Sequence, residues 1–89
     1  MRVWIKIWKN THLIKETTIV RSENDTRTHK VFHALEDACH ELDLGIPIWL
    51  DKNVKEFKRA AKTRFYQDHF MEPIDFDYLE FQVIEEDDL

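Results

Sequence analysis

The first stretch of the chain, residues 2–8, carries apolar side chains on both sides of a predicted β-strand. The odd positions are aliphatic: Val3, Ile5 and Ile7. The even positions include two indoles, Trp4 and Trp8. A strand with one face in water alternates apolar and polar residues, and this stretch does not. Both of its faces therefore need cover, and we expect this strand at the centre of a sheet.

Two further stretches have the pattern of strands. Residues 13–21 are rich in β-branched side chains and follow a short polar turn, which predicts an antiparallel hairpin with the first strand. The turn lacks an Asn-Gly or Asp-Gly pair, so the pattern does not fix the register. In residues 76–85, Leu79, Phe81 and Val83 alternate with polar residues, which indicates a half-buried strand.

Residues 27–43 change to the spacing of a helix. Their apolar positions form one stripe: Val31, Leu35, Ala38 and Leu42. Asp25 or Thr26 is a suitable cap at the start, and Gly45, the single glycine, is the expected stop. The apolar linker 46–50 follows, and we expect Trp49 to fill the core between two helices.

A second helix is predicted to begin near Asp51 or Asn53, with Asn53 as its cap. Its apolar stripe consists of Val54, Phe57, Ala61 and Phe65. The pattern does not fix where this helix ends between Lys62 and Phe70, and Pro73 excludes its continuation.

These elements predict an α+β fold: a three-stranded sheet with two helices packed on one face, in the element order β-β-α-α-β. The apolar first strand suits the centre, which favours the sheet order 2-1-3 over the rival order 1-2-3. Residues 1–85 are expected to form one domain, and residues 86–89 an acidic tail that frays.

Composition narrows the class of protein. A hydrophobic content of 43% with 12% aromatic residues argues against disorder in a chain of 89 residues. A single cysteine excludes an internal disulfide, and no apolar run is long enough to cross a membrane. The start of the chain has no apolar signal core. We therefore predict a cytoplasmic protein that does not enter a membrane.

Two segments, Pro47-Ile-Trp-Leu-Asp-Lys-Asn and Ile74-Asp-Phe-Asp-Tyr-Leu-Glu, resemble a family of small uncharacterised bacterial proteins. The resemblance extends over most of the chain. The family has no activity that could be transferred to residues of this sequence. The resemblance implies a cytoplasmic bacterial protein and adds no functional residue.

The predicted sheet leaves one face without helices. If the helices cover the odd positions of the first strand, Trp4 and Trp8 point away from them, and Tyr78 and Ile84 share this face by parity in the last strand. A contiguous exposed aromatic surface is typical of a protein–protein interface. We predict a protein partner, most simply a second copy in a homodimer. Cover by the Trp49 linker, residues 66–70 or the tail is the alternative.

Charge is segregated along the chain, whose net charge is −5. Residues 51–66 hold six basic and two acidic residues, whereas residues 67–89 hold nine acidic and no basic residues. On the second helix four basic residues fall within an arc of ~100°: Lys55, Lys58, Arg59 and Lys62. A nucleic-acid-associated protein is therefore an alternative. We disfavour it because the nearby carboxylates repel a polyanion and partly neutralise this face.

Three histidines, His29, His33 and His40, share one side of the first predicted helix. They could bind a divalent metal such as zinc, which is a further alternative, but a single exposed face provides no closed ligand shell. Cys39 flanks an apolar stripe, where an inert buried thiol is expected. We predict no catalytic residue and no cofactor. Asp75 and Asp77 are expected to be charges at the entrance of the last strand.

Overall fold

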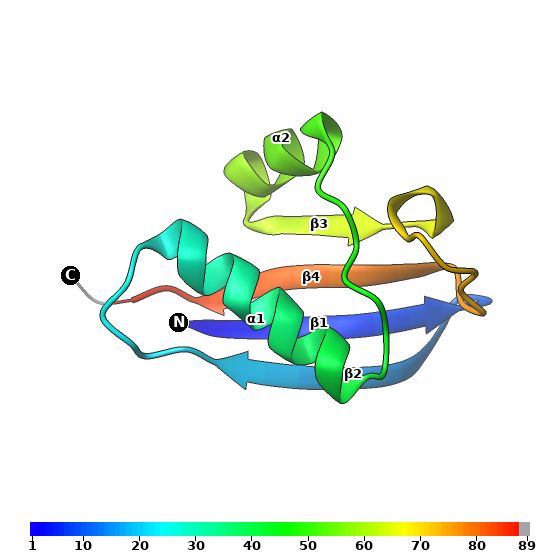
Figure 1. Ribbon diagram of the computed structural model, residues 1–89, viewed down its shortest axis with the longest axis horizontal. Helices are drawn as coiled ribbons and strands as arrows, with labels where there is room; N and C mark the ends of the chain where they lie inside the picture. The colour runs from blue at the N-terminus through cyan, green and yellow to red at the C-terminus, as the bar shows by residue number, and fades with distance from the viewer. Residues whose placement is uncertain (88–89) are drawn as a thin grey trace.

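One antiparallel sheet of four strands carries both helices on a single face (Figure 1). The computed structural model describes residues 1–87. Its elements in chain order are β1 (Arg2–Lys9), β2 (His12–Val20), α1 (Arg27–Glu41), α2 (Asp51–Ala60), β3 (Lys62–Phe65), the 3₁₀ turn η1 (Gln67–His69) and β4 (Tyr78–Glu85). The strand order is β2-β1-β4-β3. The first and last strands of the chain therefore lie side by side at the centre.

The predicted α+β class with two helices is confirmed, but the predicted number of strands is wrong. The sheet has four strands, because β3 adds to the free side of β4. The order predicted for the other three strands, with β1 between its hairpin partner and the last strand, is confirmed. The element order is therefore β-β-α-α-β-β.

The missing strand lies in the segment whose conformation the pattern left open. Helix α2 ends at Ala60, and Ala61 takes a left-handed conformation with φ 54°. This one residue turns the chain from the helix into β3, and its N–H bonds back to the Phe57 carbonyl at 2.8 Å. An alanine in this conformation gives no signal in the sequence, since such positions favour glycine. Ala61 and Phe65 also continue the helical spacing, although they lie outside the helix.

The predicted hairpin is confirmed. Its turn consists of Asn10 and Thr11, which both have positive φ, 50° and 64°. Two such residues match the right-handed twist of the flanking strands. The Asn10 N–H donates to the carboxylate of Asp77 at 2.8 Å, which ties the turn to the segment before β4. Asp77 therefore supports a turn, in addition to being a charge at the strand entrance.

Helix α1 begins as predicted and ends differently. The Thr26 hydroxyl accepts a hydrogen bond from the His29 N–H at 3.2 Å, so Thr26 is the cap. At the other end Asp43 is left-handed with φ 56°, and the Leu44 N–H reaches the Cys39 carbonyl at 2.8 Å. Helices commonly end with this hydrogen-bond pattern at a left-handed glycine, and here an aspartate takes the place of the glycine. The prediction that Gly45 ends the helix is therefore wrong.

The core lies between the helices and the odd face of β1. Val3 and Ile5 are fully buried and Ile7 is nearly so, as predicted. The predicted position of Trp49 is also confirmed. Its ring lies between 5.2 and 6.1 Å from four phenylalanine rings, edge to face. These are Phe32, Phe57, Phe65 and Phe81. Trp49 therefore joins α1, α2, β3 and β4 in one aromatic cluster.

The two described residues of the predicted tail bind the rest of the protein. Glu86 forms a bidentate pair with Arg27 at 2.9 and 3.0 Å. Asp87 accepts from Lys30 at 2.7 Å and from the N-terminal amine at 2.6 Å. These bonds hold the pKa values of Glu86 and Asp87 below their ordinary range. Residues 86 and 87 are thus tied to α1, and residues 88 and 89 lie outside the described part of the chain.

Asn53 joins α2 to the edge of the sheet. The prediction that Asn53 caps the helix is wrong. Asn53 is the third residue of the helix, and it is fully buried. Its carbonyl accepts from the Leu50 N–H at 2.9 Å, and its amide donates to the Thr63 hydroxyl at 2.9 Å and to the Arg64 carbonyl at 3.0 Å. The Arg64 carbonyl belongs to the outer edge of β3, so this amide also shields that edge.

We expect Asn53→Ala to lower the free energy of unfolding by about 2–3 kcal/mol, because it leaves several buried polar groups without partners. Urea unfolding followed by tryptophan fluorescence measures this change. Asn24→Ala, at an exposed loop position, is the matched control and should cost less than about 0.5 kcal/mol. Equal midpoints for the two variants would contradict this role of Asn53.

Candidate functional site

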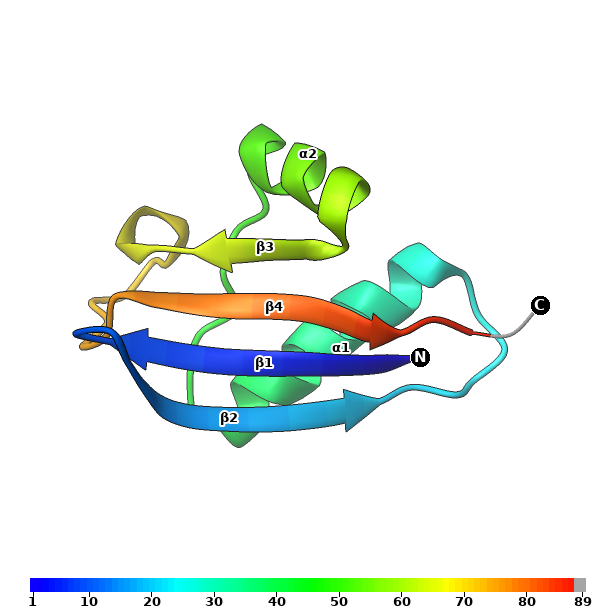
Figure 2. The same cartoon turned by 180° about the vertical axis from the view of Figure 1, so that it is seen from behind.

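The second face of the sheet is bare (Figure 2). We call it the open face, and three central rows of side chains cross its strands, set by the pairing register, with Val20 and Arg2 in a further row at the end of β4. The central row is Glu16, Lys6, Glu80 and Arg64. The row on one side is Thr18, Trp4, Gln82 and Lys62. On the other side Leu13, Trp8 and Tyr78 are in register, and Tyr66 packs against Tyr78 at 5.4 Å.

Charges alternate along the central row of the open face. From β2 to β3 the signs are negative, positive, negative and positive. The Lys6 ammonium lies 2.8 Å from one oxygen of Glu80, and Nε of Arg64 lies 3.0 Å from the other. Lys6 and Glu80 are buried although no helix covers them, with 8% and 4% of their surface exposed. Neighbouring side chains must therefore shield this pair from water.

The indole of Trp4 supplies part of this shield. The Lys6 ammonium lies 3.9 Å from the centre of the Trp4 ring, a cation–π contact. The indole N–H of Trp4 donates to Glu16 at 3.1 Å. Burial alone would raise the pKa of Glu80, but the hydrogen bonds from Lys6 and Arg64 outweigh it and hold that pKa below its ordinary value. Trp4 thus has a structural role inside the single chain, while it remains half-exposed.

A row of three aromatic rings lies next to the charges. Trp8 and Tyr78 are 6.4 Å apart, and Tyr66 extends the row toward the β3 edge. The Arg64 guanidinium lies 4.6 Å from the centre of the Tyr78 ring. Cations therefore already occupy one face of the Tyr78 ring and one face of the Trp4 ring. These two ring faces are not available for stacking with a nucleic-acid base.

The predicted partner-binding residues Trp4, Trp8 and Tyr78 come together on the open face. Ile84 sits at a β-bulge near the end of β4 and is 46% exposed. None of the segments expected as alternative cover crosses this face within residues 1–87. Trp49 lies in the core, Tyr66 is a member of the face, and the described part of the tail binds α1. The face is therefore open in the described chain.

The predicted basic residues do not form one surface. Lys62 lies in β3, outside the helix. Arg59 and Lys62 line a pocket of about 210 Å³ between α2 and β3, whereas Lys58 lines a groove between the two helices. Among residues 1–87, no carboxylate forms an ion pair with Lys55, Lys58, Arg59 or Lys62. No ion pair therefore joins these four residues to the acidic end of the chain within residues 1–87, and Glu86 and Asp87 pair with Arg27 and Lys30 instead.

The predicted histidine site is only partly assembled. His29 and His33 stack at 6.3 Å, but within residues 1–87 the group with ligand spacing is Glu23, Asp25 and His33. Arg21 enters this group, 2.7 Å from Glu23 and 3.3 Å from His33. Its hydrogen bond lowers the pKa of Glu23. A metal ion would have to displace this guanidinium.

Cys39 is fully buried among apolar side chains, as predicted. Burial raises the pKa of its thiol to about 12. A nucleophilic cysteine needs the opposite, a lowered pKa and an exposed sulfur. Cys39 therefore belongs to the core.

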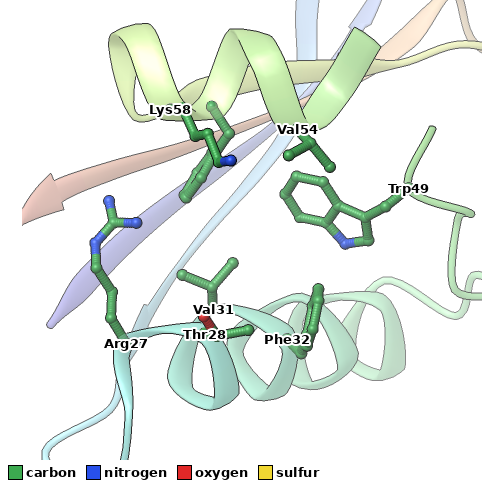
Figure 3. A pocket seen from close by; sticks show the side chains of 8 residues that line it. Arg27, Thr28, Val31, Phe32, Trp49, Val54 and Lys58 are labelled. Carbon is green, nitrogen blue, oxygen red and sulfur yellow. The ribbon is translucent and has the colours of Figure 1, made fainter. Parts of the chain in front are cut away.

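A groove between α1 and α2 is the surface that sequence reasoning missed (Figure 3). It encloses about 180 Å³, and its lining is Arg27, Thr28, Val31, Phe32, Trp49, Val54, Phe57 and Lys58. Phe32 and Val54 are 43% and 41% exposed on its walls. The indole N–H of Trp49 has no oxygen or nitrogen acceptor within residues 1–87, and the indole lies 5.9 Å from the Phe32 ring, edge to face. The available indication of this groove in the sequence was that Phe32 lies on the flank of the apolar stripe of the first helix.

Comparisons with known proteins give no relative: no family model matches the chain, and no curated protein or solved structure is similar to it. The resemblance to small bacterial proteins therefore stays a prediction. Within residues 1–87, neither helix has the length and apolar character needed to span a bilayer.

We expect Glu80→Gln to lower the free energy of unfolding by about 2 kcal/mol at pH 7, because the buried Lys6 ammonium loses its counter-charge. The folded-state pKa of Glu80 is below its unfolded value of about 4.3, so its stabilisation is present above that pH and is lost as the pH falls through the folded pKa. Urea unfolding at several pH values measures the difference from the wild type.

That difference should be constant between pH 6 and 8 and shrink below about pH 4. Glu72→Gln, an exposed loop carboxylate, is the control and should change stability little at any of these pH values. A difference for Glu80→Gln that persists undiminished at low pH would show that its carboxylate charge is not the cause.

Proposed function

We propose that this protein is a small interaction module that associates with a second copy of itself through the open face. The observation that carries this proposal is the bare face itself. It presents half-exposed aromatic side chains from β1, β4 and Tyr66, the residue after β3, and no segment of residues 1–87 covers it. An open sheet face with aromatic side chains is typical of an interface. The partner in this proposal is a second copy because the pattern of the face is self-complementary.

The alternating charges of the central row favour one orientation of the second copy. In a face-to-face dimer whose two-fold axis runs along the strands, β2 lies over β3 of the second copy and β1 lies over its β4. Glu16 then faces Arg64 of the second copy, while Lys6 and Glu80 stay paired within each copy. The same rotation places Trp8 over Tyr78 of the second copy. A two-fold axis across the strands would instead place Glu16 against Glu16, so the charges favour one orientation.

The size of the face predicts a weak dimer. Four strands about 4.8 Å apart and a central strand of eight residues give a footprint on the order of 500 Å². Stable interfaces bury roughly 600–1,000 Å² on each partner, so this one lies below that range, among weak and transient interfaces. The proposed dimer is therefore reversible, with a Kd on the order of 10 μM.

We expect sedimentation velocity to show a concentration-dependent dimer, and Glu16→Lys to weaken it about tenfold, because the new ammonium faces Arg64 of the second copy. Trp4→Lys should also shift the protein to the monomer. Glu36→Lys makes the same change of charge on the exposed side of α1 and should leave the dimer intact. A wild-type monomer at about 100 μM, or equal effects of Glu16→Lys and Glu36→Lys, would refute the proposal.

A second candidate function is polyanion binding by the basic residues of α2 and β3. The observation in its favour is that Lys55, Lys58, Arg59 and Lys62 form no ion pair within residues 1–87. The net charge of −5 counts against it.

A gel-shift titration with generic single- and double-stranded DNA and RNA at about 50 mM salt tests this second function. Binding should weaken steeply with salt and fall in the variant Arg59→Gln/Lys62→Gln. The variant Lys9→Gln/Lys15→Gln, with equal loss of charge at the other end of the sheet, is the control. The absence of a shift at low salt would exclude the function.

A further inference from the structure

We propose that the groove between α1 and α2 binds a small aromatic carboxylate. This site lies on the helix side of the sheet, away from the open face, and does not depend on self-association (Figures 1 and 3). Its apolar walls favour an apolar ligand, its volume limits the size of that ligand, and the cations at its rim favour a ligand with a negative charge.

The walls are built to receive an aromatic ring. Trp49 forms the end of the groove, and its ring contacts Phe57 and Phe32 at 5.5 and 5.9 Å, both edge to face. Val31 and Val54 complete the lining from the two helices. A ligand ring in this groove could make further aromatic contacts with Trp49 and Phe32, and each such contact adds to the energy of simple burial. The groove is therefore apolar and fixed in shape by the core cluster behind it.

The volume sets the class of ligand. At about 180 Å³ the groove is smaller than the roughly 300–1,000 Å³ of pockets for drug-sized molecules. An apolar cavity of ~150 Å³ accepts a benzene ring. One aryl ring with a short polar extension therefore fits, and a larger ligand would project into solvent.

The rim supplies the charge complementarity. Two cationic side chains, Arg27 and Lys58, lie at the same end of the groove, opposite Trp49 (Figure 3). Arg27 is already bound to Glu86 and lies 5.1 Å from the centre of the Phe57 ring, so it forms a fixed part of the wall. Lys58 has no carboxylate partner within residues 1–87.

No carboxylate belongs to the lining of the groove, which also carries the hydroxyl of Thr28 as a donor. A ligand carboxylate can therefore pair with Lys58 while its ring lies against Trp49. An ammonium in the same place would be repelled by Lys58, whereas the charge of Arg27 is already countered by Glu86.

The probe is 3-phenylpropionate, compared with its neutral and cationic analogues 3-phenylpropanol and 3-phenylpropylamine. Titration is followed in ¹H–¹⁵N spectra of the full chain, where the indole N–H signal of Trp49 reports on the groove and that of Trp4 reports on the open face. We expect shifts at Trp49 but not at Trp4, with a Kd on the order of 1 mM for a ligand of this size. The alcohol should bind more weakly, and the amine should not bind measurably.

Two substitutions test the residues. Lys58→Gln should weaken binding of the carboxylate roughly threefold to fivefold, the contribution of a partly exposed ion pair, and leave the alcohol unchanged. Lys55→Gln, an exposed position of the same helix that does not line the groove, is the matched control. Val54→Phe should fill the groove and abolish binding, and the half-exposed position allows the larger side chain without loss of the fold.

Three results would overturn the proposal. One is no shift of Trp49 at about ten times the expected Kd. Another is equal affinity for the carboxylate and the amine, which would make the groove a pocket for any apolar side chain. The third is equal binding by Lys58→Gln and Lys55→Gln. Each variant's amide spectrum shows whether it is folded, and Val54→Phe tests the groove independently of the charge.

Discussion

The pairing of β1 with β4 is the constraint on which the rest of the structure depends. It brings the first and last strands of the chain into one register, in which Ile5 lies opposite Phe81 and Lys6 opposite Glu80. Ile5 and Phe81 belong to the core under the helices, whereas Lys6 and Glu80 lie at the centre of the open face. A shift by one residue would move every side chain of one strand to the wrong face. Such a shift would be costly, because it would expose the core. It would also leave the buried charges of Lys6 and Glu80 unpaired.

The side chains on the two faces of the sheet are shielded from water in different ways. The odd face is covered by two helices and the aromatic cluster around Trp49. The even face has no second layer, and its central charges are shielded by neighbouring rings and stems. Trp4 is the clearest case, since its indole covers Lys6 and also bonds Glu16. This arrangement pairs the central charges within a single chain and leaves aromatic side chains half-exposed, although the indole N–H of Trp8 is buried without an acceptor in residues 1–87.

The small apolar groove arises from the same packing. Helix α2 is short and reaches the sheet mainly at its β3 edge, where Asn53 fixes it. Helix α1 lies across β1 and β2, so the two helices diverge, and Trp49 cannot fill the whole space between them. The remaining volume is lined by Phe32 and Val54, which are exposed for this reason. The groove is thus a consequence of how the helices are held.

The sequence by itself determined the class of the fold, the hairpin, the start of α1, the central place of β1 and the core position of Trp49. All of these follow from local periodicity or capping, which short stretches of sequence encode. It also identified Trp4, Trp8 and Tyr78 as members of one face, because parity along a strand is fixed.

Only the tertiary structure decided the fourth strand, the left-handed turns at Asp43 and Ala61, and the separation of Lys62 from the other basic residues. β3 is four residues long and is stabilised by its partner β4 and by Asn53, ten residues before Thr63. The partners of the charges were equally hidden, since Lys6 and Glu80 are 74 residues apart, the difference between their numbers. Long-range pairing selects among local conformations that the sequence alone leaves nearly equal in energy.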